Sequence, residues 1–314
     1  ARTAATAALS RSVVPELLKQ GYARPLALGV VAAAGTLAIM IPPSVILVVY
    51  GILTESSVGK LFVAGIVPGL LTVVAYVTTI LVIVRRNPLD APAGMRVAAR
   101  ERLQSLRNVW PMLVLFALVI GTLYSGVVTV TESAGLGTGG AILLAGVFLG
   151  GKVFPALREA LDRTVRTTAM IFTIIIGAFL FNYFLTLTGV TKDLLGAVAA
   201  MDVPPAAIVF AVLFIYIVLG CFMDQLAILV LTLPIVFPLM VQLHYDPIWL
   251  GIVVTKTVEI GLITPPFGMN CFVASQVSNT PLSQVFRGIT PFIMAELVVL
   301  ALLASIPQLI TWVN

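Results

Sequence analysis

The sequence predicts an all-α integral membrane protein whose helices are broken by proline at two matching positions. Of its 314 residues, 60% are hydrophobic and 10% are charged, whereas soluble domains carry about 25% charged residues. At least six apolar segments reach the ~20 residues needed to cross a bilayer core. Two of these segments contain a Pro-Pro pair, Pro42-Pro43 in one and Pro265-Pro266 in the other.

The two Pro-Pro pairs lie in a sequence repeat. Pro265 follows Pro42 by 265 − 42 = 223 residues, and a shift of that length aligns both flanks without a gap. It also aligns Pro15 with Pro238, Tyr22 with Tyr245, Gly65 with Gly288 and Pro68 with Pro291. Paired halves with interrupted membrane helices are typical of secondary transporters. The partner of 205–237 would precede Ala1, so we expect the chain to be incomplete at its N-terminus.

Four parts are expected along the chain. The first, 1–84, is the C-terminal part of the first repeat: a hairpin arm, a broken helix over 25–53 and a helix over 61–84. A cytoplasmic basic helix or loop covers 85–109. Scaffold spans fill 110–204, with a second cytoplasmic arm at 152–167. The second repeat, 205–314, holds a hairpin over 205–243, a broken helix over 247–275 and a last span over 285–312.

The charges of the connecting segments predict the direction of each crossing. Arginine and lysine are concentrated in 85–109 and 152–167, which places both segments on the cytoplasmic side. The 205–243 stretch is too long for one span, so we expect a re-entrant hairpin, tolerated at membrane depth where protein or a cavity surrounds it. An odd number of crossings then separates the two copies, which predicts an inverted repeat.

The proline breaks are candidate cation sites. Proline lacks a backbone donor and disrupts the preceding helical turn, and unpaired carbonyls at bilayer depth cost several kcal/mol. A sodium ion can satisfy such oxygens. The candidate ligands beside the first break are Gly35, Thr36 and Ser44; beside the second they are Glu259, Thr264, Gly268 and Asn270. The alternative is that each Pro-Pro pair only kinks a helix, which hydroxyl groups then repair.

The hairpin is expected to face the second break. Its turn carries Gly220 and Asp224, and Thr232 follows two turns later. Asp224 is an intramembrane acid and so a functional candidate, although it can equally cap the second arm. Lys256 is expected to pair with Glu259 three residues on. The positions with weaker claims are Thr3, Thr6 and Ser10 in the first arm, and Glu132 and Glu296, which are expected at interfacial or packing positions.

Several motifs resemble those of a known family. They are GTLAIMIPPS at 35–44, GKLFVAGIVPGLL at 59–71, TESAG at 131–135, LGCFMD at 219–224, LTLPI at 231–235 and EIGLITPPFGMN at 259–270. Together they resemble the large membrane subunit of tripartite ATP-independent periplasmic (TRAP) transporters, over nearly the whole chain. The family's G-S-S hairpin tip, which belongs just before the AxxAA of this chain, is absent, and with it half of one expected cation site.

The resemblance implies a sodium-driven importer of organic acids in the bacterial inner membrane. Its expected partners are a periplasmic substrate-binding protein and a small four-helix membrane subunit, and its fold is an ion-transporter fold with an elevator mechanism. The residues implied in cation binding are Gly35, Thr36, Pro42, Gly220, Asp224, Thr232, Thr264, Pro265 and Gly268. The organic anion is expected between them, near Ser44 and Asn270. Sodium is the only metal expected, and no cofactor.

Two other functions remain open at this point. The first is a sodium-coupled anion transporter of the same architecture that works alone, without a binding protein. The second is a membrane scaffold that transports nothing. An enzyme is not expected, because no catalytic Ser/His, HExxH or paired-aspartate arrangement occurs on the spans. Nucleic acid is not an expected partner, because the basic residues cluster in loops beside spans.

Overall fold

The computed structural model describes residues 2–92, 99–200 and 203–312, and all regular structure in these ranges is helical. In chain order the helices are α1 (Arg2–Lys19), α2 (Arg24–Met40), α3 (Val45–Thr54), α4 (Val58–Ala64), α5 (Ile66–Arg86), α6 (Ala99–Tyr124), α7 (Val130–Leu149), α8 (Val153–Thr188), α9 (Val190–Ala200), α10 (Pro205–Phe222), α11 (Gln225–Gln242), α12 (Pro247–Gly261), α13 (Met269–Val277), α14 (Leu282–Ser305) and α15 (Gln308–Thr311). Short 3-10 turns lie at Pro88–Asp90 and Gly150–Lys152. The chain forms two compact units, residues 1–92 with 174–314, and residues 93–173.

The larger unit repeats its own helix boundaries. Adding 223 to the bounds of α1 gives 2 + 223 = 225 and 19 + 223 = 242, which are the bounds of α11. Similarly, α2 and α3 correspond to α12 and α13, whose starts at 247 and 269 lie within one residue of 24 + 223 and 45 + 223. Both broken helices are therefore present where the repeat predicts them.

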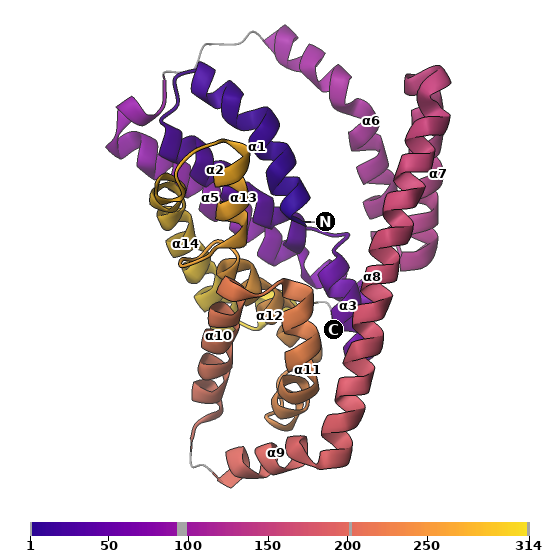
Figure 1. The fold of residues 1–314 in the computed structure, drawn as a ribbon, viewed down its shortest axis with the longest axis vertical. Coiled ribbons are helices and arrows are strands. Elements are labelled where there is room, and N and C mark those ends of the chain that lie inside the picture. The colour runs from indigo at the N-terminus through magenta and orange to yellow at the C-terminus, as the bar shows by residue number, and fades with distance from the viewer. Residues whose placement is uncertain (1, 93–98, 201–202, 313–314) are drawn as a thin grey trace. The chain divides into compact units, whose positions relative to one another are not determined.

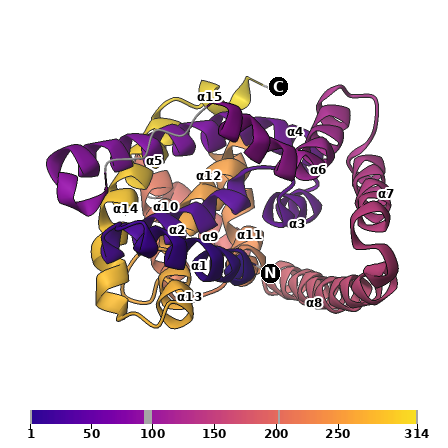
Figure 2. The same cartoon turned by 90° about the horizontal axis from the view of Figure 1, so that it is seen from above.

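Helix α12 lies at the centre of the larger unit (Figure 1). Every residue from Ile248 to Gly261 is buried, because α10, α11, α14, α4 and α2 all pack around it. The equivalent helix α2 packs mainly against α1 and α14 (Figure 2). Close approach of α2 to α14 depends on glycine, since a Cβ on Gly29 would overlap the backbone of Gly288.

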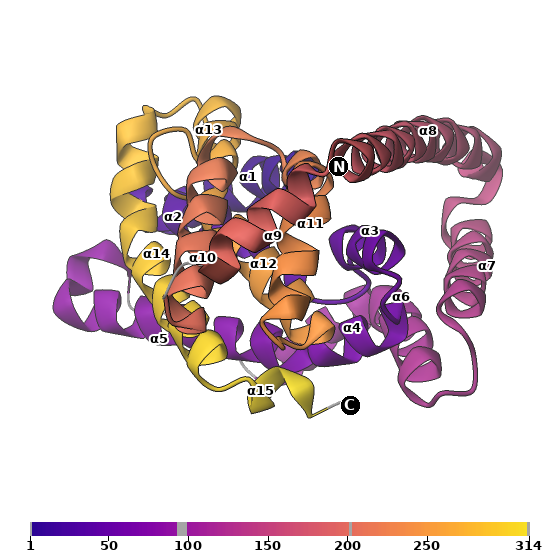
Figure 3. The same ribbon diagram turned by 90° about the horizontal axis from the view of Figure 1, so that it is seen from below.

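Helices α10 and α11 form the hairpin expected over 205–243. They are joined by an extended turn at Met223 and Asp224, and α9 lies across the opposite end of the pair (Figure 3). Pro234 and Pro238 are inside α11. Pro15 is inside α1, at the position equivalent to Pro238. The segment 189–204 is helical over most of its length, since α9 covers Val190–Ala200.

The smaller unit contains α6, α7 and the first part of α8. Helix α7 begins at Val130, so the TESAG motif at 131–135 is helical. A capping box explains the early start, since the Thr129 side chain accepts from the Glu132 backbone and the Glu132 carboxylate accepts from the Thr129 backbone. Glu132 is thus a helix-terminal residue. Side chains of 93–108 lie outside the described residues, so the basic cluster of 85–109 is described only in part.

Helix α8 runs without interruption from Val153 to Thr188, through both the basic segment 152–167 and the apolar stretch that follows it. Exposed ion pairs join Arg163 to Glu159 and Arg166 to Asp162 one turn apart, and each such pair adds only a few tenths of a kcal/mol. Over the described residues, six helical segments are long and apolar enough to cross a membrane. The multi-pass character predicted from composition is therefore confirmed.

Candidate functional site

The first break separates α2 from α3 at residues 41–44. The Pro42-Pro43 peptide bond is cis, and Ile41 at the end of α2 is extended. Among the described residues, the carbonyls of Ile41, Pro42 and Pro43 accept no backbone hydrogen bond. Ser44 begins α3 and is 3% exposed, and its hydroxyl makes no capping bond. The break therefore presents three carbonyl oxygens without backbone partners, one from the buried Pro42 and two from the exposed residues Ile41 and Pro43.

The second break separates α12 from α13 at residues 262–268, and its Pro265-Pro266 bond is also cis. Gly268 has φ of 49°, a left-handed conformation that favours glycine. Asn270 is 2% exposed; its backbone N–H donates to the Leu262 carbonyl at 3.1 Å, while its side-chain Nδ2 has no hydrogen-bond partner. A buried amide without a partner is unusual and points to a ligand or water at this place.

The hairpin tip packs directly on the second break, as the sequence predicts. A Cβ on Gly220 would lie 2.9 Å from the Gly261 backbone, so these two helices touch through glycine. The Cys221 thiol lies 3.6 Å from the Pro265 carbonyl, and the Phe222 and Phe267 rings are 5.4 Å apart. Asp224 is exposed and caps α11 by accepting from the Leu226 backbone at 2.9 Å. Its expected capping role is confirmed.

The first hairpin arm meets the first broken helix in a similar way. Thr6 on α1 is fully buried against Gly35 on α2, where an added Cβ would overlap its hydroxyl. That hydroxyl has no hydrogen-bond partner. Helix α1 also packs on α13, and α11 packs on α3. Each arm therefore contacts one half of the other copy's broken helix, and the two breaks are held in one assembly.

Three predicted hydroxyls are already bonded to carbonyls one turn earlier. Thr264 donates to Ile260 at 2.6 Å, and Thr232 donates to Ile228 at 2.7 Å. Thr232 also lies 2.6 Å from the Tyr216 hydroxyl on the other hairpin arm. The third hydroxyl is that of Thr36. It lies in a different environment, one turn before the first break and inside a buried charged cluster.

This cluster joins α12 to α14 and α5. Lys256, Glu259 and Glu296 all have side chains that are 0% exposed. The Lys256 ammonium lies 3.2 Å from Glu259 Oε2 and forms a closer ion pair with Glu296 Oε2. It also donates to the Thr72 hydroxyl at 2.8 Å. Buried charges of this kind persist only when they are paired and hydrogen-bonded.

Hydroxyl groups extend the cluster to α2. The Tyr76 hydroxyl is hydrogen-bonded to Glu296 Oε1 and lies 3.0 Å from the Thr36 hydroxyl. Thr36 in turn donates to the Ala33 carbonyl at 2.8 Å. The remaining oxygen of Glu259, Oε1, accepts no hydrogen bond, although Thr36 lies near it. We refer to these six side chains as the buried charge cluster: Thr36, Thr72, Tyr76, Lys256, Glu259 and Glu296.

Sequence reasoning missed most of this cluster. The Lys256–Glu259 pair is confirmed, and Glu296, expected at an interfacial or packing position, is wholly buried against Lys256. A usable signal was present: three charged residues lie within apolar segments, where each ionised side chain is expensive. The hydroxyl partners Thr72 and Tyr76 gave no comparable signal.

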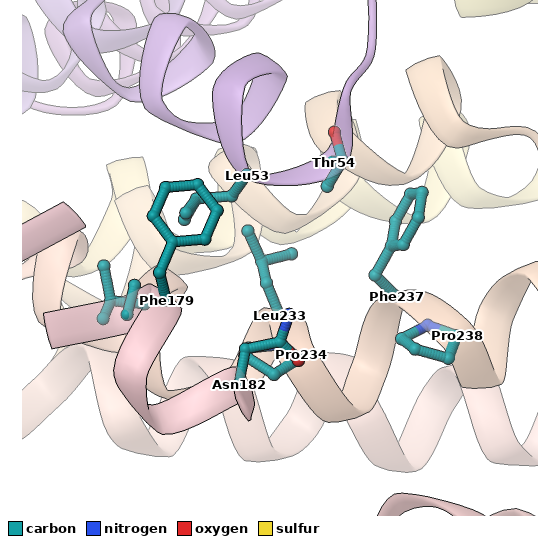
Figure 4. A pocket seen from close by; sticks show the side chains of 10 residues that line it. Leu53, Thr54, Phe179, Asn182, Leu233, Pro234, Phe237 and Pro238 are labelled. Carbon is teal, nitrogen blue, oxygen red and sulfur yellow. The ribbon is translucent and has the colours of Figure 1, made fainter. Parts of the chain in front are cut away.

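A small cavity lies elsewhere in the larger unit, between α3, α8 and α11 (Figure 4). Its volume is ≈ 90 Å³, and Leu53, Phe179 and Leu233 are among its mainly apolar lining residues. Ligand pockets usually measure about 300–1,000 Å³. The cavity is therefore not a candidate for the substrate site.

Paired broken helices, with hairpin arms packed on their breaks and several apolar spans, define a multi-pass membrane transport protein. Comparison with known families agrees: residues 1–309 match the family described as "Tripartite ATP-independent periplasmic transporter, DctM component". The chain belongs to this family of inner-membrane permease components and is not an enzyme.

Several large permeases are similar to this chain over most of its length. The chain is 36% identical to the C4-dicarboxylate TRAP transporter large permease protein DctM of Pseudomonas aeruginosa, over 97% of this chain and 71% of the relative. It is 30% identical to the ectoine/5-hydroxyectoine large permease UehC of Ruegeria pomeroyi, over 98% and 71%. It is 31% identical to the sialic acid large permease SiaM of Vibrio cholerae, over 89% and 65%. Large permeases named for different substrates are thus similar to this one chain.

Proposed function

We propose that this chain is the large permease of a sodium-coupled TRAP system that imports an organic acid across the inner membrane. The observation that carries the proposal is the pair of matching breaks, at 41–44 and 262–268, each flanked by a hairpin arm and by carbonyls without backbone partners. A hard cation such as sodium prefers oxygen ligands of this kind, and transporter sites are typically built where such helices unwind.

One sodium ion at each break is the arrangement we propose. The first would be held near Gly35 and Pro42, where the buried Thr6 hydroxyl is unpaired. The second would lie among Gly220, Asp224, Thr232, Thr264, Pro265 and Gly268. Thr36 remains a predicted ligand of the first ion, but the proposal does not depend on it, since its hydroxyl bonds Ala33 and approaches Tyr76.

The organic anion would lie between the two breaks, near Ser44 and Asn270. Both residues are at the N-terminal ends of half-helices, α3 and α13, and helix N-termini favour negative charge. The unpaired Asn270 amide is a second donor for an anion. Since the DctM relative is named for C4-dicarboxylates, a C4-dicarboxylate is the first substrate to test.

The remaining parts of the proposal concern topology and partners. An inverted repeat fits the matched helix boundaries and the exchange of arm contacts between the two copies, and an elevator motion would carry hairpins and breaks together. A periplasmic binding protein would deliver the substrate, and a small four-helix membrane subunit would accompany this chain. The word "tripartite" in the family description supports these partners over a permease that works alone.

Uptake into proteoliposomes tests the proposal. The complete complex should accumulate labelled substrate when both an inward sodium gradient and the binding protein are present, and not when potassium replaces sodium. Thr264→Val should weaken sodium activation, because it removes a candidate ligand. Thr290→Val is a matched control, since Thr290 is an exposed hydroxyl bonded one turn back to Phe286. Sodium-independent uptake with a verified binding protein would contradict the proposal.

A further inference from the structure

A second pocket lies at one end of the larger unit, where the start of α2, the end of α5 and the first part of α14 meet. Its volume is ≈ 400 Å³, which is within the usual range of ligand pockets, about 300–1,000 Å³. Three of its lining residues are charged, namely Arg86, Asp90 and Arg287. The pocket therefore carries a net positive charge.

Both arginines of this pocket are available to bind an anion. Arg86 and Arg287 are exposed, and within the described ranges neither forms an ion pair, not even with Asp90. They come from α5 and α14, which pack on each other and on α2, so helices hold the two guanidinium groups beside one pocket. A guanidinium has planar, paired N–H donors that match the oxygens of a phosphate group.

The positive charge of this pocket is not part of the repeated design. A shift of 223 residues relates Arg86 to Leu309, since 86 + 223 = 309. The same shift relates Arg287 to Ala64, since 287 − 223 = 64. The corresponding place in the other copy therefore has neither arginine. A ligand of negative charge explains why only one end of the repeat carries the pair.

An apolar stripe leads away from the pocket along α14. Residues at helical spacing share one face of a helix, and here they are Arg287, Pro291, Met294 and Val298. Met294 is 59% exposed and Val298 is 68% exposed. From residue 287 to residue 298 the helix rises ~16 Å, which is about the thickness of one leaflet in a hydrocarbon core of ~30 Å. A molecule with its phosphate in the pocket can thus lay an acyl chain on this stripe.

The pocket is on the side of the membrane that is expected to face the cytoplasm. Arg86 belongs to the basic segment 85–109, which the positive-inside rule places there. Basic pockets between membrane helices on this side are typical sites for the headgroups of anionic lipids. From the paired arginines, the apolar stripe and this position, we infer that the pocket binds the phosphate group of an anionic phospholipid of the cytoplasmic leaflet. This goes beyond the proposed transport function and does not depend on sodium coupling.

Native mass spectrometry of the permease with the small membrane subunit tests the inference, because the mass of a bound molecule identifies it. The delipidated complex is titrated with phosphatidylglycerol, with phosphatidylcholine and with inorganic phosphate. Phosphatidylglycerol should bind most tightly, since the two arginines repel the choline cation and the apolar stripe holds no part of a free phosphate. Arg86→Gln combined with Arg287→Gln should lower the affinity for phosphatidylglycerol about tenfold or more.

Two single substitutions separate the loss of a ligand site from a loss of structure. Asp90→Asn removes the carboxylate of the pocket and should tighten the binding of phosphatidylglycerol. Ala23→Asp keeps both arginines but adds a competing carboxylate to the pocket lining, so it should weaken that binding. Arg158→Gln combined with Arg163→Gln is the matched control, since it removes two exposed arginines from the basic segment 152–167. This control should leave the binding unchanged.

Three results would overturn the inference. Equal affinities of the wild-type protein and the double pocket variant for phosphatidylglycerol would mean that the lipid binds elsewhere. Equal affinities of the wild-type protein for phosphatidylcholine and phosphatidylglycerol would exclude recognition of the negative charge. Retention of inorganic phosphate in place of phosphatidylglycerol, when both are present in equal amounts, would assign the pocket to a free anion. The lipid-free double variant should unfold at the wild-type temperature, because both arginine side chains are exposed and unpaired.

Discussion

The two broken helices, α2 and α12, share a backbone design but differ in charge. Subtracting 223 from Lys256 and Glu259 gives positions 33 and 36, which are Ala33 and Thr36. The same operation on Glu296 gives position 73, which is Val73. The second copy therefore supplies every charge of the buried cluster. The first copy supplies the hydroxyls of Thr36, Thr72 and Tyr76.

This division separates two kinds of function. The breaks occur in both copies, with the same Pro-Pro pair and the same packing of a hairpin arm, so whatever they bind is a duplicated function. The charged cluster occurs once, at the contact between copies, and cannot be a duplicated site. We therefore expect a substitution at one break and the equivalent substitution at the other break to affect transport in the same way. Substitutions in the cluster should act on the stability of the whole unit.

Removing Lys256, the cation of the buried charge cluster, should have the largest effect on the stability of the protein. Lys256→Met leaves two buried acids without a positive partner, and breaking a buried ion pair in this way costs about 3–5 kcal/mol. Thermal unfolding in detergent would measure the loss. Lys256→Met combined with Glu259→Gln should recover part of it, because only one buried carboxylate, that of Glu296, then lacks a positive partner. If the double variant is no more stable than the single one, charge balance does not control this region.

The glycine contacts at the two breaks should differ in how well they tolerate substitution by alanine. Gly220→Ala would place a Cβ 2.9 Å from the Gly261 backbone and 3.0 Å from the Val258 carbonyl, and such overpacking costs up to about 3 kcal/mol. Gly35→Ala meets the hydroxyl of Thr6, a side-chain group that can rotate, so it should cost less.

Unfolding midpoints and uptake rates of these variants would show the difference. Gly196→Ala on α9 is the control, because nothing lies within 4 Å of the added atom. Equal losses at Gly35 and Gly220 would mean that both arms are held equally rigidly against their breaks.

The sequence was a good guide to the breaks and a poor one to the cluster. Proline and glycine act through the local backbone, so Pro42, Pro265 and the hairpin turn near Gly220 could be placed from their spacing alone. Glu296 meets Lys256 across 40 residues of chain, 296 − 256 = 40, and Tyr76 meets it across 220. Pairing over such distances depends on tertiary packing, which one sequence does not reveal.

Two buried threonines, one from each copy, provide a smaller test of the hydroxyl contribution. Thr36→Val removes a hydrogen bond and leaves Tyr76 without its neighbour, which should cost about 1–2 kcal/mol. Thr255 is equally buried, but its hydroxyl has no hydrogen-bond partner, so Thr255→Val should be neutral or slightly stabilising. Thermal unfolding midpoints of the two variants, measured under the same conditions, would test this difference. A loss at Thr255 as large as that at Thr36 would point to an unseen partner on the second copy.

The smallest expected effect concerns the caps of the two broken helices. Asp246 caps α12 by accepting from the Trp249 backbone at 2.8 Å, whereas the equivalent residue of α2, 246 − 223 = 23, is Ala23, which has no side-chain cap. Ala23→Asp should therefore stabilise the protein by about 0.5–1 kcal/mol. The new carboxylate can accept from the Leu26 backbone, since Pro25 has no N–H, and Arg86 and Arg287 line the same pocket as Ala23.

Asp246→Ala is the reciprocal change and should destabilise by about 1 kcal/mol. Opposite shifts of similar size in the two unfolding midpoints would show that the copies remain equivalent at their entry points, despite their different charges. A destabilising Ala23→Asp would show instead that the first copy cannot accommodate the cap of the second. The difference between the two copies would then extend from the buried charge cluster to the start of α2.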